Sequence, residues 1–140
     1  MFGQLVALSV LSKLSSRVRS STPSQCLLVT WLTATGGLYM EPLHRDDKTG
    51  GIAIKITKTA DGLYTGAPQQ VFAYNLDGAL VWYDLSTIFG EPFLGQRVEV
   101  TSNSGGSIVW PNGTSPGGSQ VKVAPSEENI WFTVYGTPGI

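Results

Sequence analysis

The densest group of chemically capable side chains lies in Glu41–Thr57, EPLHRDDKTGGIAIKIT. His44, Arg45, Asp46 and Asp47 follow one another directly, just before a Gly-Gly step. A His-Arg-Asp sequence occurs in kinase catalytic loops, and a histidine beside two carboxylates could also bind a metal or act as a general acid/base pair. The same residues are also typical of a polar turn that leads into a strand.

The kinase and metal interpretations lack the spacing that their chemistry requires. A kinase loop needs Leu directly after Asp46 and Asn five residues beyond it, where this chain has Asp47 and Gly51. A metal site needs three or four converging donors, and Glu41, His44 and the two aspartates have no recognised metal-binding spacing. We therefore expect no metal and no cofactor here.

The turn interpretation assigns each of these residues a structural task. Asp46 and Asp47 should accept backbone N–H hydrogen bonds, and Lys48 should balance their charge. Gly50-Gly51 then lets the chain enter the next strand, with His44 near the surface. The cluster is thus predicted to be a turn.

Two further kinds of catalysis remain as alternatives. The chain contains the serine, histidine and aspartate residues that a Ser-His-Asp catalytic set would need, but it has no G-x-S-x-G sequence to present a nucleophilic serine. Glycoside hydrolysis needs only two carboxylates across a cleft, and six acids are candidates. The three that we favour for this alternative are Glu41, Asp46 and Asp84.

Aromatic residues supply the candidate binding site. Strand alternation puts Trp82 and Tyr83 on opposite faces, so one of them faces outward beside Asp84. An exposed ring can stack on a sugar while a carboxylate binds its hydroxyls, although aromatics in such folds more often belong to the core. Trp110 precedes a Pro-Asn-Gly loop, which makes it the better exposed candidate, and Asn112 begins an N-x-[ST] glycosylation sequence.

Composition indicates what kind of fold must position these residues. The 140 residues suit one domain, with 41% hydrophobic and 14% charged residues, 17 Gly and 8 Pro. This balance is typical of a compact all-β domain with many turns. The net charge of −1 gives no support to nucleic-acid binding. The single cysteine, Cys26, excludes an intrachain disulfide and a cysteine-based zinc site.

Short alternating segments beyond Gly36 predict about six to eight antiparallel strands in a β-sandwich. Ile52–Thr57 puts three isoleucines on one face. Val71–Leu76 and Ala79–Tyr83 flank Asp77-Gly78 and predict a tight hairpin. Further strands are expected at Cys26–Leu32, Gln96–Thr101, Ser107–Trp110, Ser119–Val123 and Ile130–Tyr135. Leu85–Phe89 is predicted to form a single helical turn.

The N-terminal segment has a different character. Leu5–Leu11 is an apolar run of signal-peptide length and too short to span a bilayer. No Lys or Arg precedes it, so a hydrophobic start to a poorly ordered tail is the equal alternative. We divide the chain into an atypical segment, 1–35, which is a signal peptide, a linker or a mispredicted region, and a domain, 36–140.

Three segments carry a family resemblance. They are GGLYMEPLHRDDKTGGIAIKIT (Gly36–Thr57), DGLYTGAPQQVFAYNLDGALVWYDLSTIFGEPF (Asp61–Phe93) and SIVWPNGTSPGGSQVKV (Ser107–Val123). Together they resemble the fungal yeast-phase-specific antigens, small secreted proteins that are also called antigenic thaumatin-like proteins. The resemblance implies a thaumatin/osmotin-like β-sandwich at the fungal cell surface or cell wall, without established catalytic residues.

From the residues and the resemblance together, we expect a secreted, non-enzymatic fungal cell-wall protein that binds polysaccharide or another surface partner. The expected binding residues are Trp82, Tyr83, Asp84 and Trp110. The alternative is a weak β-1,3-glucan hydrolase with a carboxylate pair in a cleft.

Overall fold

The fold comes from a computed structural model, which describes residues 4–8, 26–32, 37–59 and 61–136. Its elements are ten strands and one short helix. They are β1 Gln4–Leu8, β2 Cys26–Leu32, β3 Gly37–Pro42, β4 Gly51–Ile56, α1 Gly62–Thr65, β5 Gln69–Asp77, β6 Leu80–Ile88, β7 Val98–Thr101, β8 Ile108–Trp110, β9 Lys122–Pro125 and β10 Ile130–Tyr135. The prediction of an all-β fold is confirmed.

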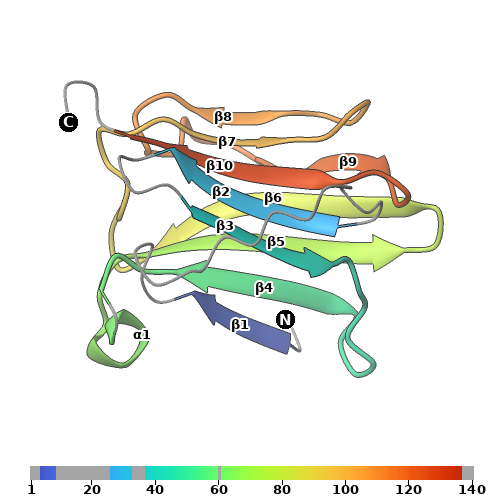
Figure 1. Cartoon of the computed structure of the whole chain (residues 1–140), viewed down its shortest axis with the longest axis horizontal. Coiled ribbons are helices and arrows are strands. Elements are labelled where there is room, and N and C mark those ends of the chain that lie inside the picture. The colour runs from blue at the N-terminus through green and yellow to red at the C-terminus, as the bar shows by residue number, and fades with distance from the viewer. Residues whose placement is uncertain (1–3, 9–25, 33–36, 60, 137–140) are drawn as a thin grey trace.

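The strands form two five-stranded sheets (Figure 1). The first sheet has the order β1-β4-β5-β6-β9, and the second has the order β3-β2-β10-β7-β8. Most neighbours are antiparallel, as predicted, but β1 with β4 and β10 with β2 are parallel pairs. Eight of the ten strands, β3 to β10, lie beyond Gly36, which agrees with the six to eight strands predicted there. Each sheet includes one strand from before residue 36, and the domain boundary drawn there stays a prediction.

One apolar core joins the two sheets because every second side chain points inward. Ile52, Ile54 and Ile56 of β4 are all buried, as predicted, although Ala53 and Thr57 on the other face are buried as well. Phe72 of the first sheet contacts Phe132 of the second, with ring centroids 6.2 Å apart. Burial of apolar surface between the sheets is the main stabilising term of such a fold.

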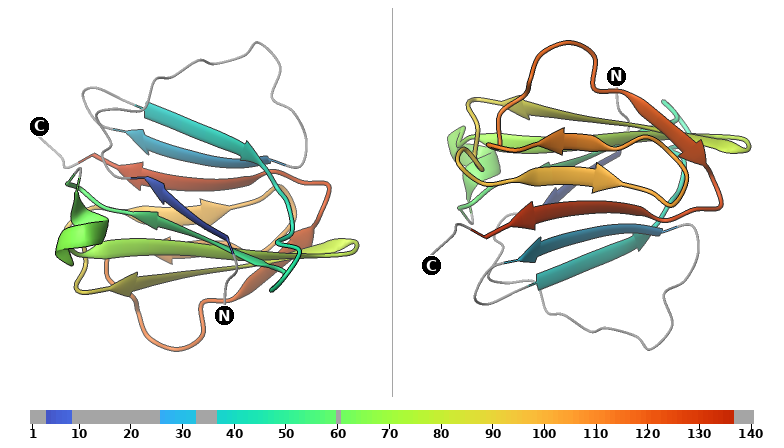
Figure 2. Two further views of the ribbon diagram at one scale, coloured as in Figure 1. Left: turned by 90° about the horizontal axis from the view of Figure 1, so that it is seen from below. Right: turned by 90° about the horizontal axis from the view of Figure 1, so that it is seen from above.

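The predicted hairpin is present, one residue away from its predicted turn. Asp77 is still paired, opposite Leu80, so the two connecting residues are Gly78 and Ala79. Gly78 has a φ of 58°, a left-handed conformation that glycine adopts without steric cost. The hairpin lies at the end of the molecule opposite α1, as the two views of Figure 2 also show.

The helical turn predicted at Leu85–Phe89 is wrong. Residues through Ile88 continue β6, and Leu85 pairs with Phe72 while its side chain enters the core. Burial on the sheet therefore outweighs the local helix signal. The only helix in the described part of the chain is α1, which ends at Gly66 with a φ of 75°.

Two of the predicted strands begin two or three residues later than expected. The strand expected at Ser119–Val123 is β9, which begins only at Lys122, because its pairing is set by β6, where Tyr83 lies opposite Lys122. The strand expected at Gln96–Thr101 begins at Val98. Residues 96–97 and 119–121, which the alternating pattern predicted as strand, therefore lie in the connections that precede β7 and β9.

Candidate functional site

A shallow groove lies on the outer face of the first sheet, where β5, β6 and β9 are neighbours. Its volume is about 180 Å³. The lining residues are Ala73, Tyr74, Asn75, Trp82, Tyr83, Asp84 and Val121. Trp82, Tyr83 and Asp84 are three of the four binding residues expected from the sequence, and all three line this groove, whereas Trp110 does not.

Trp82 forms a wall of this groove. It is 43% exposed, whereas Tyr83 beside it is 1% exposed, as alternation along β6 predicts. In the sheet Trp82 lies opposite Asn75 of β5 and Val123 of β9. An indole held by two flanking strands offers a rigid aromatic surface to a ligand.

Asp84 supplies the acceptor of the groove. It lies opposite Ala73 in the sheet, so the small alanine side chain leaves space beside the carboxylate. The Oδ1 atom of Asp84 accepts the N–H of Leu85 at 2.8 Å. The other carboxylate oxygen has no hydrogen bond among the described residues, which leaves it available for a ligand.

Asn75 lines the groove and Arg45 contacts it from outside the lining, and sequence reasoning missed both of these roles. Arg45 Nη1 donates to Asn75 Oδ1 at 3.2 Å and to the carbonyl oxygen of Leu76 at 2.9 Å. A guanidinium can only donate, so the Asn75 oxygen faces it and the amide NH₂ remains to donate to a ligand. The contact spans 30 residues of sequence, and no local motif indicates it.

The turn predicted around Asp46 is confirmed. Its Oδ2 accepts the backbone N–H groups of Lys48 at 3.0 Å and Thr49 at 2.9 Å, and the Thr49 hydroxyl at 3.1 Å. The Thr49 N–H is the main reason that the pKa of Asp46 lies below its ordinary value. Asp47 is exposed and accepts no such bond among the described residues, so that part of the prediction is wrong.

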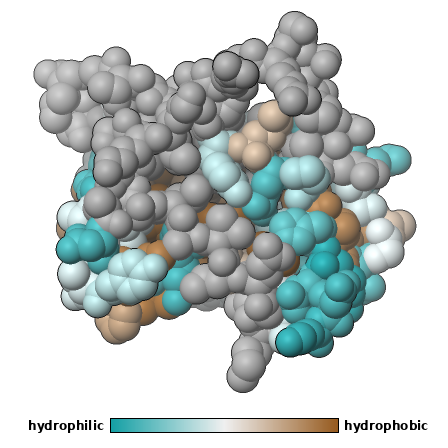
Figure 3. All heavy atoms as spheres, turned by 60° about the horizontal axis from the view of Figure 1, so that its bottom comes forward, coloured by the Kyte–Doolittle hydropathy of each residue, from teal (hydrophilic) through white to brown (hydrophobic). Residues whose placement is uncertain are grey.

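This turn is part of a polar end of the molecule. Hydrophilic side chains gather at the right of Figure 3, the end at which Figure 1 shows the loop between β3 and β4.

No group of three His, Cys, Asp or Glu residues in the described part of the chain is arranged to hold a metal ion. The described residues also contain no helix long and apolar enough to cross a membrane.

Glu41 binds two tyrosines rather than lining the groove. The hydroxyl of Tyr39 donates to Oε2 at 2.8 Å, and that of Tyr74 donates to Oε1 at 3.1 Å. His44 Nδ1 lies 3.0 Å from the carbonyl oxygen of Pro42 and 3.3 Å from the Tyr74 hydroxyl. Burial first, and then the Glu41 carboxylate, raise the pKa of Tyr74 well above its ordinary value.

The three carboxylates considered for hydrolysis do not line one cleft. Glu41 bonds Tyr74, whose side chain enters the core, whereas Asp84 lines the groove on the outer face of the same sheet. Asp46 is bound within its turn. A glycosidase pair must face the two sides of one sugar bond, so we do not propose the hydrolase alternative further.

The predicted exposure of Trp110 is wrong. The side chain is 0% exposed, and its indole N–H donates to Gln120 Oε1 at 3.1 Å. Ile108 and Trp110 both face the core from β8, because alternation continues to the last residue of the strand. Asn112, two residues later, is exposed.

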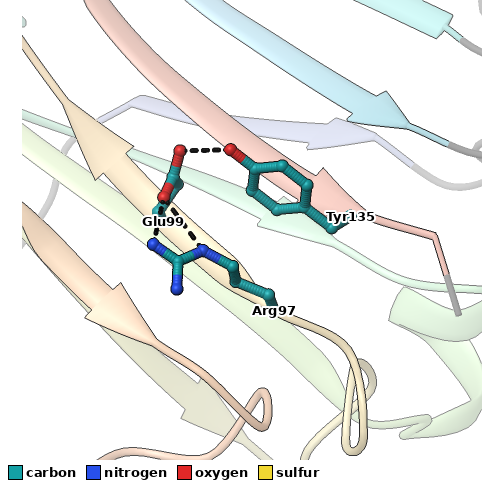
Figure 4. Close-up of polar contacts among 3 residues, drawn as sticks. All are labelled: Arg97, Glu99 and Tyr135. Carbon is teal, nitrogen blue, oxygen red and sulfur yellow. Dashed lines mark hydrogen bonds and ion pairs between the residues drawn. The ribbon is translucent and has the colours of Figure 1, made fainter. Parts of the chain in front are cut away.

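A second polar cluster is formed by Arg97 just before β7, Glu99 on β7 and Tyr135 on β10 (Figure 4). Arg97 Nη2 and Nε contact Glu99 Oε2 at 2.9 and 3.2 Å, and the Tyr135 hydroxyl donates to Glu99 Oε1. The Arg97 guanidinium also lies 5.7 Å from the centre of the Tyr135 ring. Both oxygens of Glu99 are thus occupied, which makes this a structural cluster rather than a ligand site.

Comparison with known proteins identifies the family. No curated protein matches the chain. The crystal structure of the protein elicitor MoHrip2 from Magnaporthe oryzae has a similar fold, with a TM-score of 0.55 and 18% sequence identity over 79% of this chain and 98% of that one. Residues 20–136 match the model of the Bys1 family, described as Blastomyces yeast-phase-specific protein, and the chain therefore belongs to that family.

Proposed function

We propose that this chain is a secreted fungal cell-wall protein with a thaumatin-like β-sandwich, and that its outer-face groove binds a wall polysaccharide. Membership of the yeast-phase-specific family supports a fungal protein of this kind. The thaumatin-like assignment and the location rest on the resemblance of the sequence segments given above.

The observation that carries the binding proposal is the exposed Trp82 beside two free polar groups. The Asn75 amide can donate and the Asp84 carboxylate can accept, while Ala73 gives an apolar floor. Sugar rings have apolar C–H faces and hydroxyl edges, so they match an aromatic wall with polar groups at its side. Trp110, being buried, is not part of this proposal.

The size of the groove limits what it can hold. Its volume of about 180 Å³ lies below the range of about 300 to 1,000 Å³ typical of pockets for drug-sized ligands. It therefore suits one sugar ring of a chain that continues into solvent. Single-ring contacts give weak affinity, so binding is best measured on a polymer that repeats the unit.

Sedimentation with insoluble wall polymers tests the proposal. The purified protein is mixed with β-glucan, chitin and mannan, and the fraction that pellets with each polymer is measured. We expect pelleting with at least one polymer and its loss in Trp82→Ala. Leu80→Ala is the matched control, because Leu80 is also 43% exposed on β6 but does not line the groove. Protein that stays wholly in the supernatant with all three polymers overturns the proposal.

Secretion would also expose Asn112 to glycosylation. The side chain is exposed in a turn, and the Thr114 hydroxyl of the same sequence motif is bonded to Glu91. Modification must therefore precede folding of this turn, when the hydroxyl is free. Protein collected from a fungal culture medium should lose mass on treatment with an N-glycosidase, and Asn112→Gln should not. Equal masses of treated and untreated wild-type protein would show that Asn112 is not used.

A further inference from the structure

We propose that the groove selects a sugar that carries a protonated amine, such as the glucosamine unit of deacetylated chitin. The inference rests on the proposed function, since it specifies the ligand of the same groove. It follows from the charge and the surroundings of Asp84.

Asp84 brings an unbalanced negative charge into a largely apolar hollow. The side chain is half-buried, and its hydrogen bond from Leu85 satisfies only one carboxylate oxygen. The one ion pair among the described residues joins Arg97 to Glu99, so Asp84 has no cationic partner there. A carboxylate that is partly removed from water without a partner is unfavourable, and a cationic ligand would offset that cost.

Two basic side chains near the groove, Arg45 and Lys122, form no ion pair with Asp84 among the described residues. Arg45 donates to Asn75 and to the carbonyl oxygen of Leu76. Lys122 lies opposite Tyr83 on β9, and its stem packs against Gly106, where an added Cβ would come within 2.7 Å of the lysine Cδ. Ala73 lies opposite Asp84 on β5, and Val121 lines the same groove; both side chains are neutral.

Trp82 adds a second preference for a cation. Of the aromatic side chains, Trp attracts a cation most strongly through its ring face, and the attraction grows when water is excluded. An ammonium group on a sugar could thus contact both Trp82 and the Asp84 carboxylate, while the C–H face of the ring covers Ala73. A neutral sugar would gain only hydroxyl hydrogen bonds, and an acidic sugar would be repelled.

Soluble oligomers of equal length provide the test. Binding of glucosamine, N-acetylglucosamine and β-1,3-glucose oligomers is measured by calorimetry and by the change in tryptophan fluorescence. We expect the glucosamine oligomer to bind at least about tenfold more tightly than either neutral oligomer, because a charge-assisted bond is about twice as strong as a neutral one. The preference should disappear at a pH at which the amine is neutral.

Asp84→Asn tests the role of the charge with little change of shape. The amide oxygen can still accept the Leu85 N–H, so the fold should persist, and binding of the three oligomers should become nearly equal. Asp47→Asn is the matched control, since it removes the same charge from an exposed turn residue outside the groove.

The outcomes separate this inference from the proposed function. Equal binding of all three oligomers by the wild type, or a preference that survives Asp84→Asn, overturns the inference and leaves polysaccharide binding intact. A preference reduced equally by Asp47→Asn would reflect the overall charge of the protein and also overturns it. Failure to bind any oligomer or any insoluble polymer overturns both.

Discussion

The Tyr74 hydroxyl on the first sheet donates a hydrogen bond to Glu41 Oε1 on the second sheet, at 3.1 Å. Tyr74 is 1% exposed, so this bond links a core side chain to a carboxylate at the margin of the other sheet. Tyr39 donates to the second oxygen of the same carboxylate. Glu41, which the sequence offered as a catalytic acid, thus serves as a shared acceptor between the sheets.

Replacing Tyr74 with Phe should lower the free energy of unfolding by about 1.5 to 3 kcal/mol, the usual contribution of a hydrogen bond to a charged group. The ring would still fill the core, so loss of the hydroxyl is the main change. Urea unfolding of the purified variant gives the value. Tyr39→Phe removes the other donor, and its smaller burial predicts a smaller loss. Equal stability of Tyr74→Phe and wild type would mean that the inter-sheet bond contributes nothing.

Asp46 should make the stability of the protein depend on acid pH. Its pKa in the fold is below the ordinary value of 3.8, chiefly because of the Thr49 backbone N–H. A depressed pKa stabilises the fold above the unfolded value, and this contribution is lost as the pH falls below 3.8 through the folded value. Asp46→Asn should therefore show a shallower loss of stability over this acid range.

The measurement is the urea midpoint between about pH 5 and pH 2, the range over which a carboxylate with a lowered pKa titrates. Asp47→Asn serves as the control, because Asp47 is adjacent and exposed and has no backbone hydrogen bond within the described turn. Parallel pH curves for wild type and Asp46→Asn would contradict the prediction.

Replacement of Trp82 or Trp110 by Ala should affect different properties: polymer binding for Trp82 and stability for Trp110. Trp110→Ala removes a fully buried side chain and should cost about 3 to 5 kcal/mol. Trp82→Ala removes an outward-facing side chain and should change stability by less than about 1 kcal/mol while it abolishes polymer binding. Urea unfolding and the sedimentation assay distinguish them. A strongly destabilised Trp82→Ala would show that the groove wall is part of the core.

Gly113 and Gly78 allow the cost of a left-handed backbone to be compared with and without a steric clash of the added Cβ. Both have positive φ, 70° and 58°, but a Cβ at Gly113 would lie 1.9 Å from the Phe93 carbonyl oxygen, whereas a Cβ at Gly78 meets nothing within 4 Å. Gly78→Ala should cost about 1 to 2 kcal/mol, the price of a left-handed residue. Gly113→Ala should cost clearly more, because the neighbouring backbone must also move. Equal unfolding midpoints for the two variants would contradict this assignment.

Alternation of apolar residues was enough to predict the all-β class, the isoleucine face of β4 and the opposite orientations of Trp82 and Tyr83. These features depend on a period of two, which is local and is written directly in the sequence. The Asp46 turn was predictable for the same reason, since its hydrogen bonds reach only three residues along the chain. The family resemblance likewise depends on sequence segments alone.

Only the tertiary structure decided which strands pair, which side chains are buried between the sheets, and which distant residues contact one another. Leu85–Phe89 has a helix signal, yet pairing with β5 makes residues 85–88 part of a strand. The loop after Trp110 does not expose its indole because β8 packs on the core. Arg45 reaches Asn75, and Tyr74 reaches Glu41, across separations of 30 and 33 residues. Such contacts depend on how two sheets stack and on which strands are neighbours, and these are properties of the whole chain rather than of any segment.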